Sequence, residues 1–161
     1  MSSAAEGATA GFLVWRLSMK WRVAVDRAVA PLGLTHAQYA LMASLYGMAR
    51  SGQRPSQRQL ADHTGLEALY VSKLSRTLEA AGLVARTRNP DDPRAMQLSL
   101  TGQGREVTRR AITVVQGLLD QLLEPLGGQD GPRAREFTRQ LATLLDPPLD
   151  PHPENDEERQ P

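Results

Sequence analysis

Residues 65–82, GLEALYVSKLSRTLEAAG, carry the side chains of this sequence that are best suited to recognising another molecule. Two glycines bound the segment, and the apolar residues recur at about 100° per residue, which predicts one helix. The side chains expected in the core are Val71, Leu74, Leu78 and Ala81. The opposite, outward face consists of Leu69, Ser72, Lys73 and Arg76, with Tyr70 at its border.

Each side-chain type on that outward face has a use in the major groove of DNA. A leucine packs on a thymine methyl group, a serine hydroxyl bonds a base edge, and lysine and arginine reach phosphates or guanine. The Tyr70 hydroxyl is suited to a phosphate. These types near the start of a helix are typical of a recognition helix. The alternative is a solvated face with one exposed leucine, which is common in proteins.

The segment before it, RPSQRQLADHTG, predicts a short helix that positions the first one. Ser56 and Gln59 form a capping-box pattern, and Gly65 supplies the left-handed turn that ends the helix near His63. Two helices joined by so short a glycine turn must cross steeply, as in a helix-turn-helix. Ser56 and Gln57, at the start of this helix, are included among the expected DNA contacts.

After Gly82 the pattern favours extended structure. LVARTR and AMQLSL flank the turn sequence NPDDP, which predicts a β-hairpin. The hairpin contributes Arg86, Arg88 and Arg94 to the expected contacts, and Arg94, beside the turn, is best placed to enter a minor groove. Asp92 is expected to hold the Arg94 guanidinium. The alternative is a solvated hairpin with one surface ion pair.

Four further helices are expected around this core, which makes the fold class mainly α with a small β-wing. They cover about residues 10–30, 36–50, 103–124 and 133–145, and capping residues Thr35 and Thr101 precede the second and third. The predicted domain spans 10–145, with a winged helix at 34–101 and flanking regions at 10–32 and 102–145. The flanking helices carry apolar residues on more than one face, which predicts dimerisation. Residues 1–9 and the acidic, proline-rich 146–161 are expected to be disordered.

Composition and charge limit the possible functions. The 161 residues are 40% hydrophobic and 23% charged, with no cysteine, which excludes disulfides, thiolate metal sites and cysteine nucleophiles. Residues 50–110 hold 11 Arg or Lys against 6 acids, and this basic segment favours an anionic partner. Neither a membrane span nor a signal peptide is expected, so we expect a cytoplasmic protein.

Residues 55–106, from PSQRQL through LEAAGLV and DPRA to LSLTGQGRE, resemble the winged-helix core of the MarR family of bacterial transcriptional regulators. The resemblance implies a homodimer that binds a pseudo-palindromic operator, with one recognition helix in each half-site and the wing arginine in the minor groove. It places Leu69, Tyr70, Ser72, Lys73 and Arg76 on recognition-helix positions and Arg94 at the wing tip. The family often has Ser, Thr or Arg where this chain has Glu67, Ala68 and Leu69. Recognition of DNA is therefore expected to depend less on direct base contacts there and more on groove shape and on the wing.

The resemblance also implies release from DNA by a small aromatic or anionic effector. The side chains that can line an effector cleft are Trp15, Trp21, His36, Tyr39 and Tyr46, although such residues more often belong to a core or an interface. No metal site, cofactor or catalytic arrangement is expected, and the protein is not expected to be an enzyme. We therefore predict a dimeric DNA-binding repressor. The alternatives are a winged-helix module for protein–protein assembly and a metal-responsive regulator.

Overall fold

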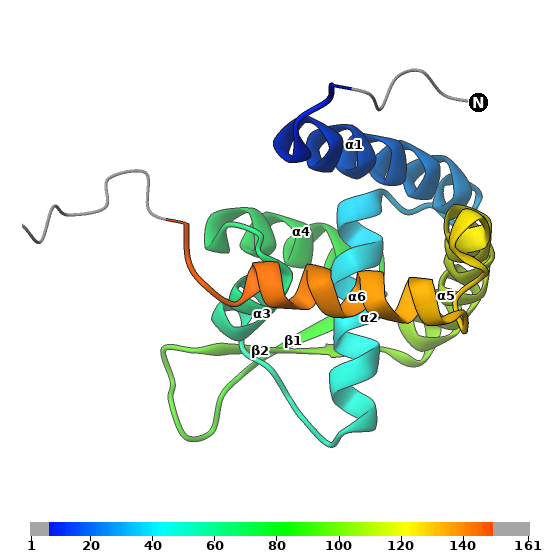
Figure 1. Cartoon of the computed structure of the whole chain (residues 1–161). Helices are drawn as coiled ribbons and strands as arrows, with labels where there is room; N and C mark the ends of the chain where they lie inside the picture. The colour runs from blue at the N-terminus through cyan, green and yellow to red at the C-terminus, as the bar shows by residue number, and fades with distance from the viewer. Residues whose placement is uncertain (1–6, 150–161) are drawn as a thin grey trace, which may run out of the picture. The chain divides into compact units, whose positions relative to one another are not determined.

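A computed structural model of the chain describes residues 7–149, which form two compact units (Figure 1). The first unit extends to Leu118 and the second begins at Leu119, so the boundary falls inside the helix expected at about 103–124. Most of the two segments expected to be disordered, 1–9 and 146–161, lies outside the described residues.

The first unit has the predicted mainly helical fold with a two-stranded wing. Each expected helix and the hairpin are confirmed, with bounds within about three residues of those predicted. The elements of this unit are α1 (Ala10–Val29), the 3₁₀ turn η1 (Ala30–Leu32), α2 (His36–Arg50), α3 (Gln57–Thr64), α4 (Ala68–Ala80), β1 (Val84–Arg88), β2 (Met96–Leu100) and the start of α5 (Gly102–Leu123).

Both predicted capping boxes form. The Gln38 backbone N–H donates to Thr35 Oγ1 at 3.3 Å, and the Thr35 N–H donates to Gln38 Oε1 at 2.9 Å. Ser56 and Gln59 exchange the same pair of bonds at 3.1 and 2.8 Å. These bonds satisfy helix-end donors that have no partner within the helix, so they define where α2 and α3 begin.

The core of the first unit consists of buried side chains from its helices and its wing. The buried residues of this core include Val25, Val29, Leu41, Met42, Leu45, Leu60, Val71, Leu74, Leu78, Leu83, Val84, Leu98 and Ala111. The prediction that Ala81 joins them is wrong. The helix ends at Ala80 and the chain turns at Gly82 (φ +74°), so Ala81 stays exposed and Leu83 is buried instead.

The wing is an antiparallel pair in which Val84, Arg86 and Arg88 of β1 face Leu100, Leu98 and Met96 of β2. The free edge of β2 is partly covered by the segment before α3. There the Leu98 N–H donates to the Pro55 carbonyl at 3.0 Å, and Ser56 bridges to Gln97. Because an isolated two-stranded hairpin is marginal in water, this third segment and the buried leucines stabilise the wing base.

The wing returns to the helical body at a close backbone contact. Thr101 Oγ1 donates to the Gly82 carbonyl at 2.7 Å and accepts from the Gly104 N–H at 3.0 Å. A Cβ on Gly104 would lie 1.9 Å from the Leu83 carbonyl oxygen. Only glycine therefore fits at this point, where α5 passes the start of β1.

The second unit contains the rest of α5, the 3₁₀ turn η2 (Glu124–Leu126) and α6 (Pro132–Leu145). Leu123 and Ala134 are its buried side chains among the residues described. Toward its end, Leu144 and Leu145 are 68% and 84% exposed. Much of the apolar surface of α6 is therefore uncovered within this unit.

We predict that Gly104→Ala destabilises the protein by about 2 kcal/mol or more, because the added methyl group forces backbone atoms apart. The matched control is Gly47→Ala in α2, where an added Cβ meets nothing within 4 Å. That variant should be neutral or more stable, by up to about 1 kcal/mol, since alanine favours a helix over glycine. Urea unfolding measures both. Equal stability of the Gly104→Ala and native proteins would contradict the close contact.

Candidate nucleic-acid interface

The outward face of α4 is at the surface, as its pattern predicts. Leu69 is 69% exposed and Tyr70 is 43% exposed, Lys73 and Arg76 are exposed, and Ser72 is half-buried. On the other side of the helix, Val71, Leu74 and Leu78 are buried in the core. This burial holds α4 in one rotation about its axis, so the polar and cationic side chains stay outside.

Ser75 is a buried residue of α4 that the sequence analysis did not identify. It is fully buried, and its Oγ donates to the Val71 carbonyl one turn earlier at 2.7 Å. A serine can occupy a helix core when it finds such a backbone acceptor, so its polarity alone gave no signal of burial.

The wing tip is a turn held by side-chain bonds to the backbone. Asn89 Oδ1 accepts from the Asp91 N–H at 2.9 Å, and Asp92 Oδ1 accepts from the Arg94 N–H at 3.0 Å. The expectation that Asp92 holds the Arg94 guanidinium is therefore wrong. An aspartate at this position caps its own turn through the backbone two residues on. Within residues 7–149, no carboxylate lies within 4.0 Å of the Arg94 guanidinium, and the residue is exposed.

A groove of about 700 Å³ separates the wing tip from α3 and from the first residue of α4. Figure 1 shows the loop between β1 and β2 projecting away from these helices. The polar side chains along the groove are Ser56, Gln57, Arg58, Asp62, Asp92 and Arg94. The fold therefore brings Ser56 and Gln57 to the same groove as Arg94, although some 40 residues separate them in the sequence.

Arg58 was missed by the sequence analysis. It is exposed, lies in the capped first turn of α3 and borders the groove together with Arg94. A basic residue two positions after a capping serine was a usable signal, because a helix start and a cation both favour an anion.

The three hairpin arginines, predicted alike, have different surroundings. Arg88 and Arg94 are exposed. The Arg86 side chain is only 17% exposed, and its Nη1 lies 3.6 Å from Glu79 Oε1. Alternation along β1 does not explain this difference, since Arg86 and Arg88 point to the same face of the strand. What differs is that Arg86 lies beside the last turn of α4.

The aromatic residues considered for an effector cleft are spread over α1 and α2. Trp15 is 59% exposed and borders a hollow along α1 with Met19 and Lys20. Trp21, Tyr39 and Tyr46 are partly buried against the core. Tyr46 also borders a different hollow, of about 750 Å³, between the end of α2 and the wing strands.

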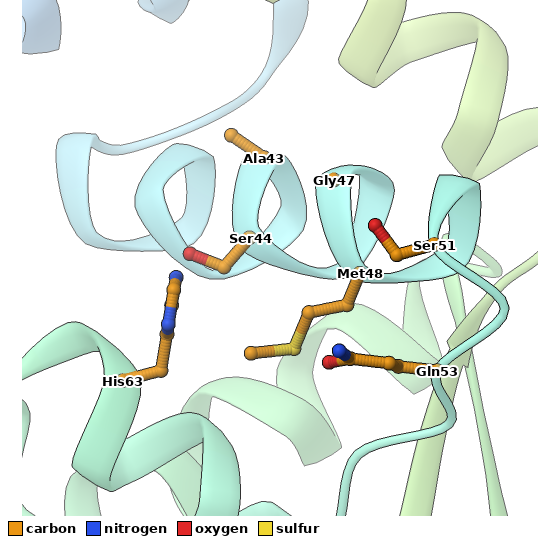
Figure 2. A pocket seen from close by; sticks show the side chains of 7 residues that line it. All are labelled: Ala43, Ser44, Gly47, Met48, Ser51, Gln53 and His63. Atoms are coloured by element: carbon orange, nitrogen blue, oxygen red, sulfur yellow. The ribbon is translucent and has the colours of Figure 1, made fainter.

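A further hollow of about 580 Å³ lies between α2 and α3 and contains none of those aromatic residues (Figure 2). In Figure 2 the His63 imidazole points toward Ser44, with the Met48 thioether beside them. The other lining residues are Ala43, Gly47, Ser51 and Gln53.

His36 is the first residue of α2, and its backbone N–H donates to Asp26 Oδ1 at 2.9 Å. Burial is the largest cause that lowers the pKa of His36 below its ordinary value of 6.5; Arg22 lowers it further and Asp26 opposes the shift. Among residues 7–149, His, Asp and Glu form no cluster of three or more that can hold a metal ion. No helix in the same range is long and apolar enough to cross a membrane.

Two helices joined by a short glycine turn and followed by an arginine-bearing hairpin, all on one core, define a winged helix-turn-helix protein. A profile of the MarR family matches residues 34–96, which covers α2 through the start of β2. The relatives below extend this match over most of the chain. The chain belongs to the MarR family, and it is a DNA-binding transcriptional regulator. Members of this family are regulators and not enzymes.

Two relatives support the assignment at the level of sequence. The uncharacterised transcriptional regulator YdcH of Bacillus subtilis is 37% identical over 106 residues, which is 66% of this chain and 72% of YdcH. The transcriptional repressor Rv2887 of Mycobacterium tuberculosis is 32% identical over 142 residues, which is 87% of this chain and 96% of Rv2887.

Solved structures agree on the fold. The crystal structure of Rv2887 matches with a TM-score of 0.60 and 30% identity, covering 89% of this chain and 98% of that one. The MepR–DNA complex of Staphylococcus aureus matches with a TM-score of 0.74, covering 86% and 97% of the two chains. At 20% identity this second match shows a shared fold only.

The lowered pKa of His36 predicts a pH effect on stability. The unfolded chain binds the imidazole proton at the ordinary value of 6.5, whereas the folded chain disfavours it. The free energy of unfolding should therefore fall as the pH drops through 6.5 toward the folded-state pKa. His36→Asn should make this dependence less steep between about pH 7.5 and 5.5 in urea titrations. The same slope in both proteins would contradict the burial of the neutral ring.

Proposed function

We propose that the protein binds a pseudo-palindromic operator as a homodimer and represses transcription. The observation that carries the proposal is the groove that separates the first residue of α4 from Arg94 of the wing. It lets one subunit present a helix to a major groove and an arginine to the neighbouring minor groove. This two-part contact is characteristic of winged or armed helix-turn-helix proteins on DNA.

The proposed roles follow from exposure and chemistry. On α4, Leu69 packs on a thymine methyl group, Ser72 bonds a base edge, and Lys73 and Arg76 reach phosphates or guanine. The hydroxyl groups of Tyr70 and Ser56 donate to phosphates; Ser56 Oγ accepts its capping bond, so its proton remains available. Arg94 enters the minor groove, and Arg88 and Arg58 add phosphate contacts.

Dimerisation is supported by apolar side chains that neither unit covers. On α1, Phe12, Leu13, Val14 and Trp15 are 45–59% exposed, and on α6 Leu144 and Leu145 are more exposed still. An uncovered apolar surface of this kind marks an interaction site in a soluble protein. A second copy of the chain is the proposed partner, because a two-fold dimer places two recognition helices about 34–36 Å apart, one turn of DNA.

Repression is supported by the name of the relative Rv2887, which is a repressor. An effector that releases the protein from DNA is proposed from the family resemblance, with Trp15, Trp21, His36, Tyr39 and Tyr46 as the residues to test first. We also propose a cytoplasmic location, where the operator would be.

The direct test is selection of bound fragments from genomic DNA by the purified protein. We expect one motif made of two inverted half-sites whose centres are about 10–10.5 base pairs apart. Affinity for that motif should fall steeply with salt, with a logarithmic slope of about 0.9 for each phosphate neutralised. A single half-site would contradict the dimer, and a salt-independent or absent interaction would contradict DNA binding.

We predict that Arg94→Ala weakens operator binding by about 1–2 kcal/mol, within the range for one base-reading arginine. Its thermal unfolding should match that of the native protein, because the guanidinium is exposed and unpaired among residues 7–149. Electrophoretic mobility shift and calorimetry measure the two quantities. Native affinity in this variant would remove the proposed minor-groove contact.

Leu69→Ala is the matched variant in the major groove. It should change the preferred base opposite that residue while leaving affinity for random duplex unchanged, since an apolar contact carries sequence information without charge. Equal losses on operator and random DNA would contradict a thymine contact.

A further inference from the structure

We propose that Arg86 is a positioning residue that ties the wing to both helices of the helix-turn-helix, and that it does not contact DNA. Its contacts with Glu79 and Gln57 are called the Arg86 bridge below. The inference rests on the proposed function for its effect on DNA, although the bridge itself can be tested without DNA.

The Arg86 bridge joins three elements through one guanidinium. Nη1 lies 3.6 Å from Oε1 of Glu79, in the last turn of α4. With the Gln57 amide oxygen facing the guanidinium, it accepts from Arg86 Nε at 3.2 Å and from Nη2 at 3.3 Å. Gln57 is the first residue of α3, and Arg86 is the middle residue of β1. The planar fork of an arginine can make all three contacts at once.

Arg86 is less exposed than Arg88 and Arg94, the two hairpin arginines that are proposed to contact DNA. It pairs in register with Leu98, which is 1% exposed, and its own side chain is 17% exposed. Within residues 7–149, Arg88 and Arg94 have no carboxylate within 4.0 Å. A phosphate contact by Arg86 would have to compete with Glu79 for a partly buried charge, and breaking such a pair is costly.

The bridge also offsets an unfavourable interaction between Glu79 and the dipole of α4. Glu79 lies in the C-terminal turn, where the helix dipole disfavours a negative charge. The Arg86 guanidinium opposes that charge, so the two residues stabilise each other where α4 passes the wing. Glu79 remains 44% exposed, so its charge is also screened by water.

The position of the bridge along the hairpin gives it a role in recognition. Val84, Leu98 and Leu100 hold the wing base in the core, and the tip beyond Arg88 makes its described hydrogen bonds within its own turn. Arg86 therefore fixes the angle at which the tip leaves the body. The recognition helix and the wing tip can bind DNA at the same time only when the distance between them matches the distance between the two grooves.

The direction in which DNA affinity changes when Glu79 loses its charge distinguishes this proposal from a direct contact between Arg86 and DNA. Removing an acid near a DNA-binding face should, by electrostatics alone, raise affinity for DNA. Glu79→Gln should instead lower operator affinity about fivefold, a typical coupling between two sites, because Arg86 loses its charged partner. The matched control is Glu67→Gln at the other end of α4, where the side chain makes no capping bond. That variant should bind DNA as tightly as the native protein or more tightly.

Arg86→Lys adds a second distinction. A lysine keeps a phosphate contact but cannot form the fork that reaches both Glu79 and Gln57. We expect Arg86→Lys to lose about fivefold in operator affinity with an unchanged salt slope. Combined with Arg94→Ala, its effect should be less than additive, because the tip arginine is already misplaced.

Amide hydrogen exchange of the free protein tests the bridge without DNA. The wing amides of Asn89 and Leu98, which donate to the Ala95 and Pro55 carbonyls, should exchange faster in Glu79→Gln and Arg86→Lys than in the native protein or Glu67→Gln. Unchanged exchange, together with tighter DNA binding by Glu79→Gln, would overturn the proposal. Native operator affinity in Arg86→Lys would also overturn it, because a lysine keeps a direct phosphate contact but cannot form the bridge. A native protein that ignores DNA while the exchange pattern holds would refute the proposed function and leave the bridge standing.

Discussion

Every contact that α4 is proposed to make with DNA depends on the burial of the opposite face of this helix. Val71, Leu74 and Leu78 pack into the same core as Leu60 of α3 and Leu98 of the wing. Each such side chain contributes about 1.5–3 kcal/mol when it is fully buried. A rotation of α4 that brought its cationic face inward would lose several of these contributions at once. The burial of the apolar side therefore holds the exposed side of α4 in one orientation.

The position of the wing is set more by the segments packed against it than by the pairing of its own two strands. Its outer edge is paired by Pro55 and Ser56, and its exit is held where Gly104 passes Leu83 without a side chain between them. The segment that pairs with β2 also begins α3, so the same few residues position the helix pair and the hairpin. This shared attachment explains how a small β-element can present an arginine at a defined place beside a helix.

Charge counted along the sequence overstates the charge that is available to a partner. Residues 50–110 have 11 basic side chains against 6 acidic ones. Arg86 is paired with Glu79 inside the domain, and Asp92 accepts a backbone bond at the wing turn. The exposed cations on α4 and the wing tip keep no such partner among residues 7–149. Among residues 7–149, the surfaces proposed to meet DNA therefore keep cations that no carboxylate neutralises.

The sequence by itself determined the elements and their order, since capping boxes at Thr35 and Ser56, the left-handed Gly65 and the turn at 89–93 are local signals read within a few residues. It also determined which face of α4 is outward. Only the tertiary structure decided the partners of individual side chains. Arg86 and Arg88 share one strand face, yet only the first meets Glu79 and Gln57, because that depends on where two helices end in space. Asp92 accepts a bond from the Arg94 backbone N–H, and the buried Ser75 donates to the Val71 carbonyl. In both cases the fold determines which hydrogen-bond partner is within reach of the polar side chain.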